Sequence, residues 1–178
     1  MKNATPVLRN FENAEEFFCY ITESPHFSLH KVEGEGNANL YRERLKVASK
    51  NIRYLLGLYF PYLNFSVNLE RSNTSNSISV EFKSFNPEKM NGVLDYQELK
   101  KEIKRFYSYI RHFQDQDGEK GEYIYNFRKT YGEASYVFPD NNFLNFTMEA
   151  LHQANERYLS KNLIKNPSKT PSFSPGRF

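Results

Sequence analysis

The sequence predicts an α+β protein, in which a small antiparallel sheet is packed by three to four amphipathic helices. Apolar residues recur at helical spacing along four long stretches, and strict alternation of apolar and polar residues marks two neighbouring strands. The 178 residues include 16 Phe and 13 Tyr but no Trp, so Phe and Tyr supply most of the core. A chain of this length buries enough apolar surface to fold without disulfides, and Cys19 is its one cysteine.

One globular domain is expected over residues 1–164, followed by a disordered basic tail rich in Pro and Ser over residues 165–178. The last 18 residues contain no acidic residue and four basic ones: Lys161, Lys165, Lys169 and Arg177. Without these four, 20 of the 24 basic residues remain against 21 acidic ones, so the net charge of +3 does not describe the domain. Its positive charge is therefore local and is balanced by acidic regions elsewhere.

The first helix is expected over residues 10–22, with Asn10 as its N-cap. Ser24 and Pro25 end it, because the residue before a proline avoids the α region. Residues 26–32 are ambiguous between a short strand and a turn of helix, and residues 33–37 form a loop rich in glycine.

A second helix is expected over residues 39–60 and ends at Pro61. A hairpin follows over residues 63–85, because two runs alternate between apolar and polar positions. The first run contains Phe65, Val67 and Leu69, and the second contains Ile78, Val80 and Phe82. Residues 71–76 form the polar loop between them.

The third helix has the clearest start signal, since Asp95 suits an N-cap and Glu98 follows three residues later. Its apolar face runs to Phe113, and residues 115–118 form a solvated turn. Residues 122–138 are rich in aromatic residues and are predicted to be extended, as possible further strands with a turn at Gly132. A last helix is expected over residues 142–161.

Both central helices carry a basic stripe opposite their apolar face. Arg42, Lys46, Lys50 and Arg53 follow one face of the second helix, and two parallel basic rows follow the third. Lys and Arg neutralise phosphates, and tyrosines among them stack on unpaired bases. The residues predicted to bind a nucleic acid or another partner are Arg42, Lys46, Lys50, Arg53, Lys100, Lys101, Lys104, Arg105, Tyr109 and Arg111. The alternative is that these are ordinary solvated helix faces.

Neither a metal site nor a cofactor site nor a catalytic residue is predicted. His26 and His30, with Cys19 and Glu33 nearby, have ligand types suited to zinc. However, Pro25 prevents a continuous helix from Cys19, and a strand would hold the two histidines about 13 Å apart. Paired carboxylates that meet only in three dimensions remain open, so an enzyme whose pocket is assembled from distant residues is a third hypothesis.

Residues 60–67 follow a basic amphipathic helix and precede the alternating residues 77–82. In this pattern, residues 40–113 resemble a small domain associated with large polyvalent proteins of phages and conjugative elements. The chain departs from that family at residues 72–76, where Ser-Asn-Thr-Ser-Asn replaces a glycine-rich hairpin tip. The resemblance implies a mobile genetic element, whose small proteins often counter host defences.

The sequence thus favours a non-enzymatic accessory protein in the cytoplasm of a bacterial host. It would bind RNA, DNA or a host ribonucleoprotein through its basic helical face and inhibit a host defence system such as CRISPR. The alternative is a protein–protein adaptor or inhibitor, whose aromatic segment and acidic stretches contact a basic protein. No membrane partner is expected, since no apolar run approaches the ~18 residues of a spanning helix and no signal peptide is recognisable.

Overall fold

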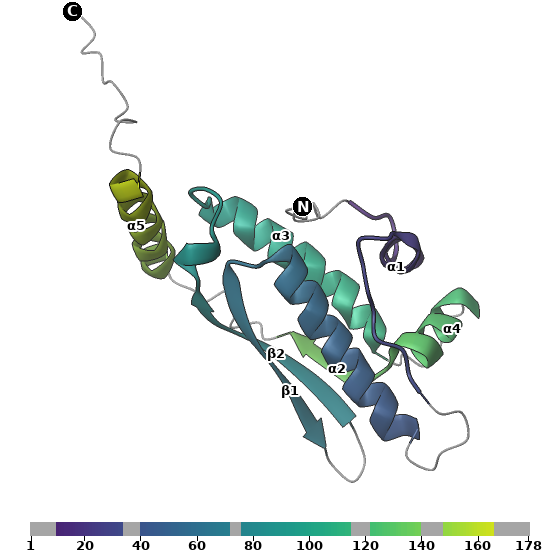
Figure 1. Cartoon of the computed structure of the whole chain (residues 1–178). Helices are drawn as coiled ribbons and strands as arrows, with labels where there is room; N and C mark the ends of the chain where they lie inside the picture. Colours follow the sequence, from purple (N-terminus) through teal and green to yellow (C-terminus); the bar gives the residue numbers. More distant parts are fainter. Residues whose placement is uncertain (1–9, 34–39, 72–75, 115–121, 140–147, 166–178) are drawn as a thin grey trace, which may run out of the picture.

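The computed structural model describes residues 10–33, 40–71, 76–114, 122–139 and 148–165. Its elements are α1 (Ala14–Glu23), α2 (Leu40–Tyr59), β1 (Leu63–Arg71), β2 (Asn76–Phe85), the 3-10 helix η1 (Pro87–Lys89), α3 (Tyr96–Ile110), the 3-10 helix η2 (Arg111–Phe113), α4 (Glu122–Tyr131), β3 (Tyr136–Pro139) and α5 (Met148–Lys165) (Figure 1). The predicted α+β class, with a small sheet packed by helices, is confirmed. Five predictions fall partly or wholly outside the described residues: the loop after Glu33, the hairpin loop at 71–76, the turn at 115–118, the first turns of the last helix and the tail beyond Lys165.

The sheet has the order β1-β2-β3. The hairpin prediction is confirmed, because β1 and β2 pair antiparallel along their length, with a bulge between Asn64 and Phe65. β3 instead pairs parallel with β2, from Ser77 beside Tyr136 to Val80 beside Pro139. The sheet is therefore mixed and not wholly antiparallel as expected. A parallel neighbour requires a long crossover, and here the crossover contains α3 and α4.

The prediction that residues 122–138 are extended is wrong for most of the segment, because residues 122–131 form α4. Tyr123, Phe127 and Tyr131 recur every four residues and pack against the core from one face of this helix. The Phe127 ring stacks on that of Phe18, with centroids 3.8 Å apart. Aromatic residues favour strands only weakly, and this tertiary contact decides the conformation.

The two helix starts that the sequence predicts have different outcomes. Asp95 caps α3 as expected, since its carboxylate accepts a hydrogen bond of 2.8 Å from the Glu98 amide. α1 begins four residues later than expected, because Asn13 and not Asn10 is its N-cap. The Asn13 side chain accepts a hydrogen bond of 2.9 Å from the Glu16 amide.

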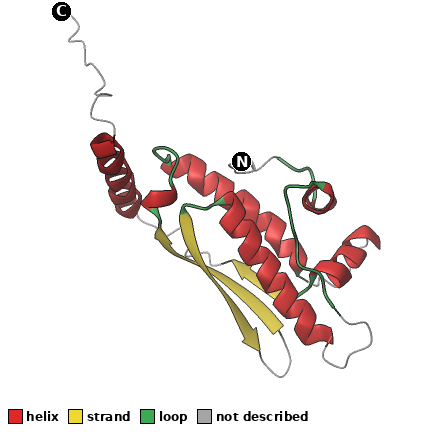
Figure 2. Ribbon diagram, viewed as in Figure 1, coloured by secondary structure: helices red, strands yellow, loops and turns green. Residues whose placement is uncertain are grey.

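α2 and α3 lie side by side on one side of the sheet, and α1 and α4 extend the helical layer at one end (Figures 1 and 2). One hydrophobic cluster draws members from all five α-helices and all three strands of the described part. Five phenylalanines are among its fully buried side chains: Phe17, Phe18, Phe60, Phe106 and Phe113. On the opposite side of the sheet, β1 presents exposed Asn64 and Asn68.

Residues 28–32, which we call the strap, cross α2 without forming a helix or strand. The fully buried Asn51 of α2 joins the strap to the end of α4. Its side-chain oxygen accepts from the His30 amide at 2.7 Å. Its amide nitrogen donates to the carbonyl oxygens of His30 at 2.9 Å and Tyr131 at 2.8 Å. The strap therefore lies against one side of α2, where Asn51 satisfies the backbone N–H and carbonyl groups of His30.

The variant Asn51→Ala is expected to lower the free energy of unfolding by about 2 kcal/mol, because it removes the fully buried partner of three backbone groups. Chemical denaturation measures this loss. Asn68→Ala, on the exposed face of β1, is the matched control and is expected to change stability by less than about 0.5 kcal/mol. Equal effects of the two variants would contradict the role given to Asn51.

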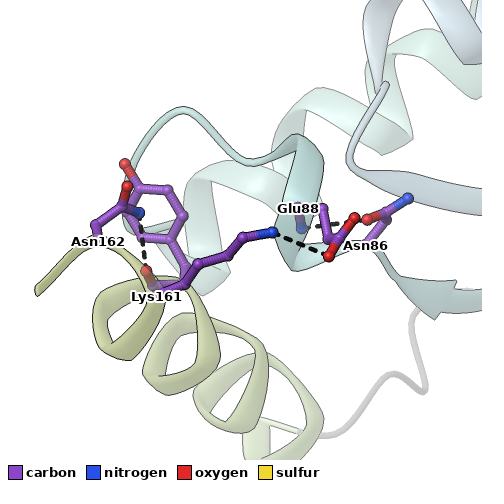
Figure 3. Close-up of polar contacts among 5 residues, drawn as sticks. Asn86, Glu88, Lys161 and Asn162 are labelled. Atoms are coloured by element: carbon purple, nitrogen blue, oxygen red, sulfur yellow. Dashed lines mark hydrogen bonds and ion pairs between the residues drawn. The ribbon is translucent and has the colours of Figure 1, made fainter. Parts of the chain in front are cut away.

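α5 docks against the segment that follows the hairpin. Lys161 Nζ lies 2.9 Å from Glu88 Oε1 of η1, and the Asn86 side chain accepts a hydrogen bond of 3.1 Å from the Glu88 amide (Figure 3). The Asn155 side chain makes two hydrogen bonds of 3.0 Å with the backbone of Leu94, one as donor and one as acceptor. These contacts hold η1 at the end of the sheet, beside the C-terminal end of α2.

Candidate nucleic-acid interface

The α2 stripe, which consists of Arg42, Lys46, Lys50 and Arg53, lies on the open face of α2. Arg42, Lys50 and Arg53 are exposed, and Lys46 is half-buried. The other sides of the helix pack against the sheet, the aromatic residues of α3 and the strap. The predicted basic stripe is therefore accessible to a partner along the length of the helix.

One carboxylate lies within the α2 stripe. Lys46 Nζ lies 2.6 Å from Glu43 Oε1. This hydrogen bond lowers the pKa of the Glu43 carboxyl, and the nearby charges of Lys46, Arg42 and Lys50 lower it further. Glu43 is therefore ionised at neutral pH, and the stripe retains a net charge of three from its four cations.

Arg53 is oriented by the sheet. Its Nη2 donates a hydrogen bond of 2.7 Å to the carbonyl oxygen of Val67 on β1, the outer strand of the sheet. This contact satisfies a backbone acceptor of an edge strand. A guanidinium has five N–H donors, so the fixed group retains donors for a ligand.

Arg53 also borders a concavity between α2 and β1, which we call the α2–β1 groove. The groove has a volume of about 240 Å³ and is lined by Arg53, Leu56, Gly57, Pro61, Leu63, Asn64, Phe65 and Lys89. Lys89 brings a second cation from η1, and the lining contains no acidic residue. Gly57 leaves one wall open, because a Cβ atom there would have no neighbour within 4 Å.

The α3 stripe consists of Lys100, Lys101, Lys104, Arg105 and Arg111. Three of these are exposed and two are half-buried, and the half-buried Lys100 has its Nζ 4.6 Å from the centre of the Tyr96 ring. Glu98 and Glu102 belong to the same helix and partly offset its charge. The α3 stripe is therefore accessible as predicted, but acidic residues interrupt its cations.

Glu102 is a half-buried residue of α3, and its charge acts on Tyr62 in the turn that precedes β1. Burial raises the pKa of its carboxyl, and the negative charge of Glu98 raises it further. Burial, together with the charge of Glu102, raises the pKa of Tyr62 to about 12. Ionisation of Glu102 is therefore less favourable in the folded protein than in the unfolded chain.

A carboxyl with a raised pKa in the folded state stabilises the protein at acidic pH, and this contribution is lost as the pH rises through that pKa. Glu102→Gln is therefore expected to raise the melting temperature at pH 7, and this gain should disappear near pH 4. Thermal denaturation at the two pH values measures the difference. Glu70→Gln, at an exposed position of β1, is the matched control. A gain from Glu102→Gln that is equal at both pH values would contradict the account.

Tyr109 lies in the core and not on the basic surface. Only 6% of its side chain is exposed, and its ring stacks on Phe17 with centroids 4.8 Å apart. Its hydroxyl oxygen accepts a hydrogen bond of 3.1 Å from the Phe11 amide. The ring therefore has no open face on which a base could stack.

The two basic stripes point away from each other. The rings of Tyr59 on α2 and Phe106 on α3 are 5.5 Å apart and mark the side on which the helices meet. At 3.6 residues per turn, Lys46 lies about 140° around α2 from Tyr59, and Lys104 lies about 160° around α3 from Phe106. The stripes therefore belong to two surfaces, and one continuous face around the hairpin does not form.

Two residues of the groove were not singled out in the sequence. In the sequence, Gly57 is a poor helix former near the end of the second predicted helix, and Lys89 belongs to neither basic stripe. Asn followed by Pro is a sequence signal for the start of a short helical turn. In the structure, Asn86 is the N-cap of η1 and Pro87 is its first residue. That this turn lies beside α2 depends on how the hairpin and α5 pack, and no local pattern indicates that packing.

Other kinds of site are not evident in the described ranges. Among these residues, no group of three or more His, Cys, Asp and Glu side chains is placed to hold a metal ion. Every helix in the same ranges is too short or too polar to cross a lipid bilayer.

Comparison of the chain with protein-family models, with curated proteins and with solved structures finds no match. The resemblance of residues 40–113 to a domain of polyvalent proteins therefore stays a prediction.

Proposed function

We propose that this chain is a non-enzymatic accessory protein that binds RNA, DNA or a nucleoprotein through the α2 stripe. The observation that carries the proposal is the open face of α2, where three exposed cations and one half-buried cation share the helix with one acidic residue, Glu43. Arg42 and Arg53 are eleven residues apart, which corresponds to about 16 Å along a helix. A strand with one phosphate per ~3.4 Å presents about five phosphates over that length.

The α2 stripe is a better candidate than the α3 stripe for two reasons. Its end continues into a concave groove that adds Lys89 and no acidic residue. The α3 stripe lies on the convex surface of its helix, and Glu98 and Glu102 of the same helix interrupt its cations. A concave cationic surface offers a strand more contacts than a convex one of equal charge.

The resemblance over residues 40–113 adds a context to this proposal. It suggests a phage or conjugative element in a bacterial cytoplasm, where binding would inhibit a host defence system such as CRISPR. This part depends on the resemblance alone. Capture of partners from a host lysate, with and without nuclease, tests it, because loss of a host ribonucleoprotein after nuclease treatment is the expected outcome.

A second candidate function is that of a protein–protein adaptor. Tyr136 and Phe138 of β3 are 46% and 53% exposed, and their rings stack with centroids 5.7 Å apart. Aromatic residues are enriched in protein interfaces, and acidic Glu12, Glu15 and Glu16 precede or begin α1. Under this function a basic protein is the partner, and Phe138→Ser should abolish its binding while nuclease has no effect.

Fluorescence anisotropy with a labelled single-stranded RNA and a labelled DNA duplex tests the proposal. Contact with about four phosphates of a single strand predicts a slope near −2.8 for log K against log salt, or about a 50-fold loss of affinity between ~50 and ~200 mM salt. Absence of binding to either probe at ~50 mM salt would refute nucleic-acid binding. The adaptor function would then be the better account.

A further inference from the structure

The α2–β1 groove combines features that suit one nucleotide. Its two cations come from different elements, Arg53 from α2 and Lys89 from η1, and no acid lies between them. The groove also has an aromatic wall, since the half-buried Phe65 lines it beside Pro61. The groove therefore contains cations that suit a phosphate and an aromatic ring that suits a base.

The orientation of the cations favours an anionic ligand. Arg53 is fixed by its hydrogen bond to the Val67 carbonyl oxygen, so its remaining donors lose little freedom when a ligand binds. Within the described residues, no acidic side chain forms an ion pair with Lys89. An ammonium without an acidic partner and a fixed guanidinium are typical of sites that bind phosphate groups.

The shape of the groove favours an unpaired base over a duplex. The bases of a duplex are stacked inside it, whereas a base of a single strand is free to turn outward and pack on an aromatic ring. Gly57 leaves room at the rim, because no atom beyond the local helix backbone lies within 4 Å of the position of its missing Cβ. The groove volume of about 240 Å³ is below the ~300–1,000 Å³ typical of pockets for drug-sized ligands, so the groove has room for one nucleotide at most.

We infer that the groove holds one unpaired nucleotide of a single strand, with its phosphate between Arg53 and Lys89 and its base against Phe65. The inference rests on the proposed function, because the strand reaches the groove along the α2 stripe. It makes the protein selective for single-stranded nucleic acid over duplex. Arg42, Lys46 and Lys50 contact the backbone of either form.

Two variants test the groove by different means. Lys89→Ala removes its second charge, and Gly57→Leu fills its open rim without changing charge. Each is expected to weaken binding of a labelled octamer of uridine by about tenfold and to leave binding of a DNA duplex within about twofold. Leucine has a higher helix propensity than glycine, so the fold should be retained, which circular dichroism checks.

Lys104→Ala on α3 is the charge-matched control, and it should change binding of both probes by less than about twofold. Equal weakening of single strand and duplex by Lys89→Ala, or no effect of Gly57→Leu on the octamer, would overturn the nucleotide site. Nucleic-acid binding through the α2 stripe would survive that result. If the unaltered protein binds neither probe at ~50 mM salt, the proposed function and the nucleotide site both fail.

Discussion

Arg42→Glu combined with Lys50→Glu is expected to weaken binding of a single-stranded RNA by about 100-fold at ~50 mM salt. The double variant changes the charge of the α2 stripe by four, from three positive to one negative, so the stripe repels phosphates. Both side chains are exposed, and neither forms a hydrogen bond or an ion pair with another described residue. The fold should therefore be unaffected, and fluorescence anisotropy measures the loss of affinity.

Lys101→Glu combined with Lys104→Glu is the matched control, because it makes the same change of charge on exposed positions of α3. It is expected to weaken binding by less than about threefold, since the α3 stripe faces away from the α2 stripe and the remaining long-range effect is screened. A loss equal to or larger than that of the α2 variant would assign the interface to α3. It would contradict the choice of α2.

Gly132→Ala is expected to lower the free energy of unfolding by about 4 kcal/mol, the largest stability effect that the structure predicts. Gly132 has a φ of +98°, in a region that side chains rarely adopt. A Cβ atom there would lie 2.5 Å from the Arg44 carbonyl oxygen and closer still to the Ala48 amide nitrogen. Both neighbours are backbone atoms of α2, so the clash is relieved only by moving that helix. Denaturant titration measures the loss.

Gly57→Ala, within α2 itself, is expected to have the opposite effect. Gly57 lies in the last turn of α2, and no atom beyond the local helix backbone lies within 4 Å of its missing Cβ. Alanine there should raise the free energy of unfolding by about 1 kcal/mol through helix propensity alone. If Gly57→Ala lowered the free energy of unfolding as much as Gly132→Ala, the loss at Gly132 could not be assigned to its close packing against α2.

Where local signals were strong, the sequence predicted the structure well. The alternation of Phe65, Val67 and Leu69 placed β1, and the Asp95 cap placed the start of α3. The α2 stripe was also predicted, because helical spacing alone places its four cations on a different face from the buried residues. These features depend on residues within one or two turns of each other.

The features that the sequence did not predict depend on contacts between distant residues. The aromatic run of α4 is helical because Phe127 stacks on Phe18, more than a hundred positions earlier. Tyr109 followed the basic residues in sequence, yet it packs on Phe17 in the core. The groove likewise combines Arg53 of α2 with Lys89 of η1, which lies on the far side of the hairpin in sequence.

The central claim is that the cations of the α2 stripe contact phosphate groups. The most direct test is the slope of log K against log salt for single-stranded RNA, compared between the unaltered protein and Arg42→Gln combined with Lys50→Gln. Loss of two phosphate contacts predicts that the slope becomes shallower by about 1.4. An unchanged slope, whatever the change in affinity, would show that these two cations do not contact the nucleic acid.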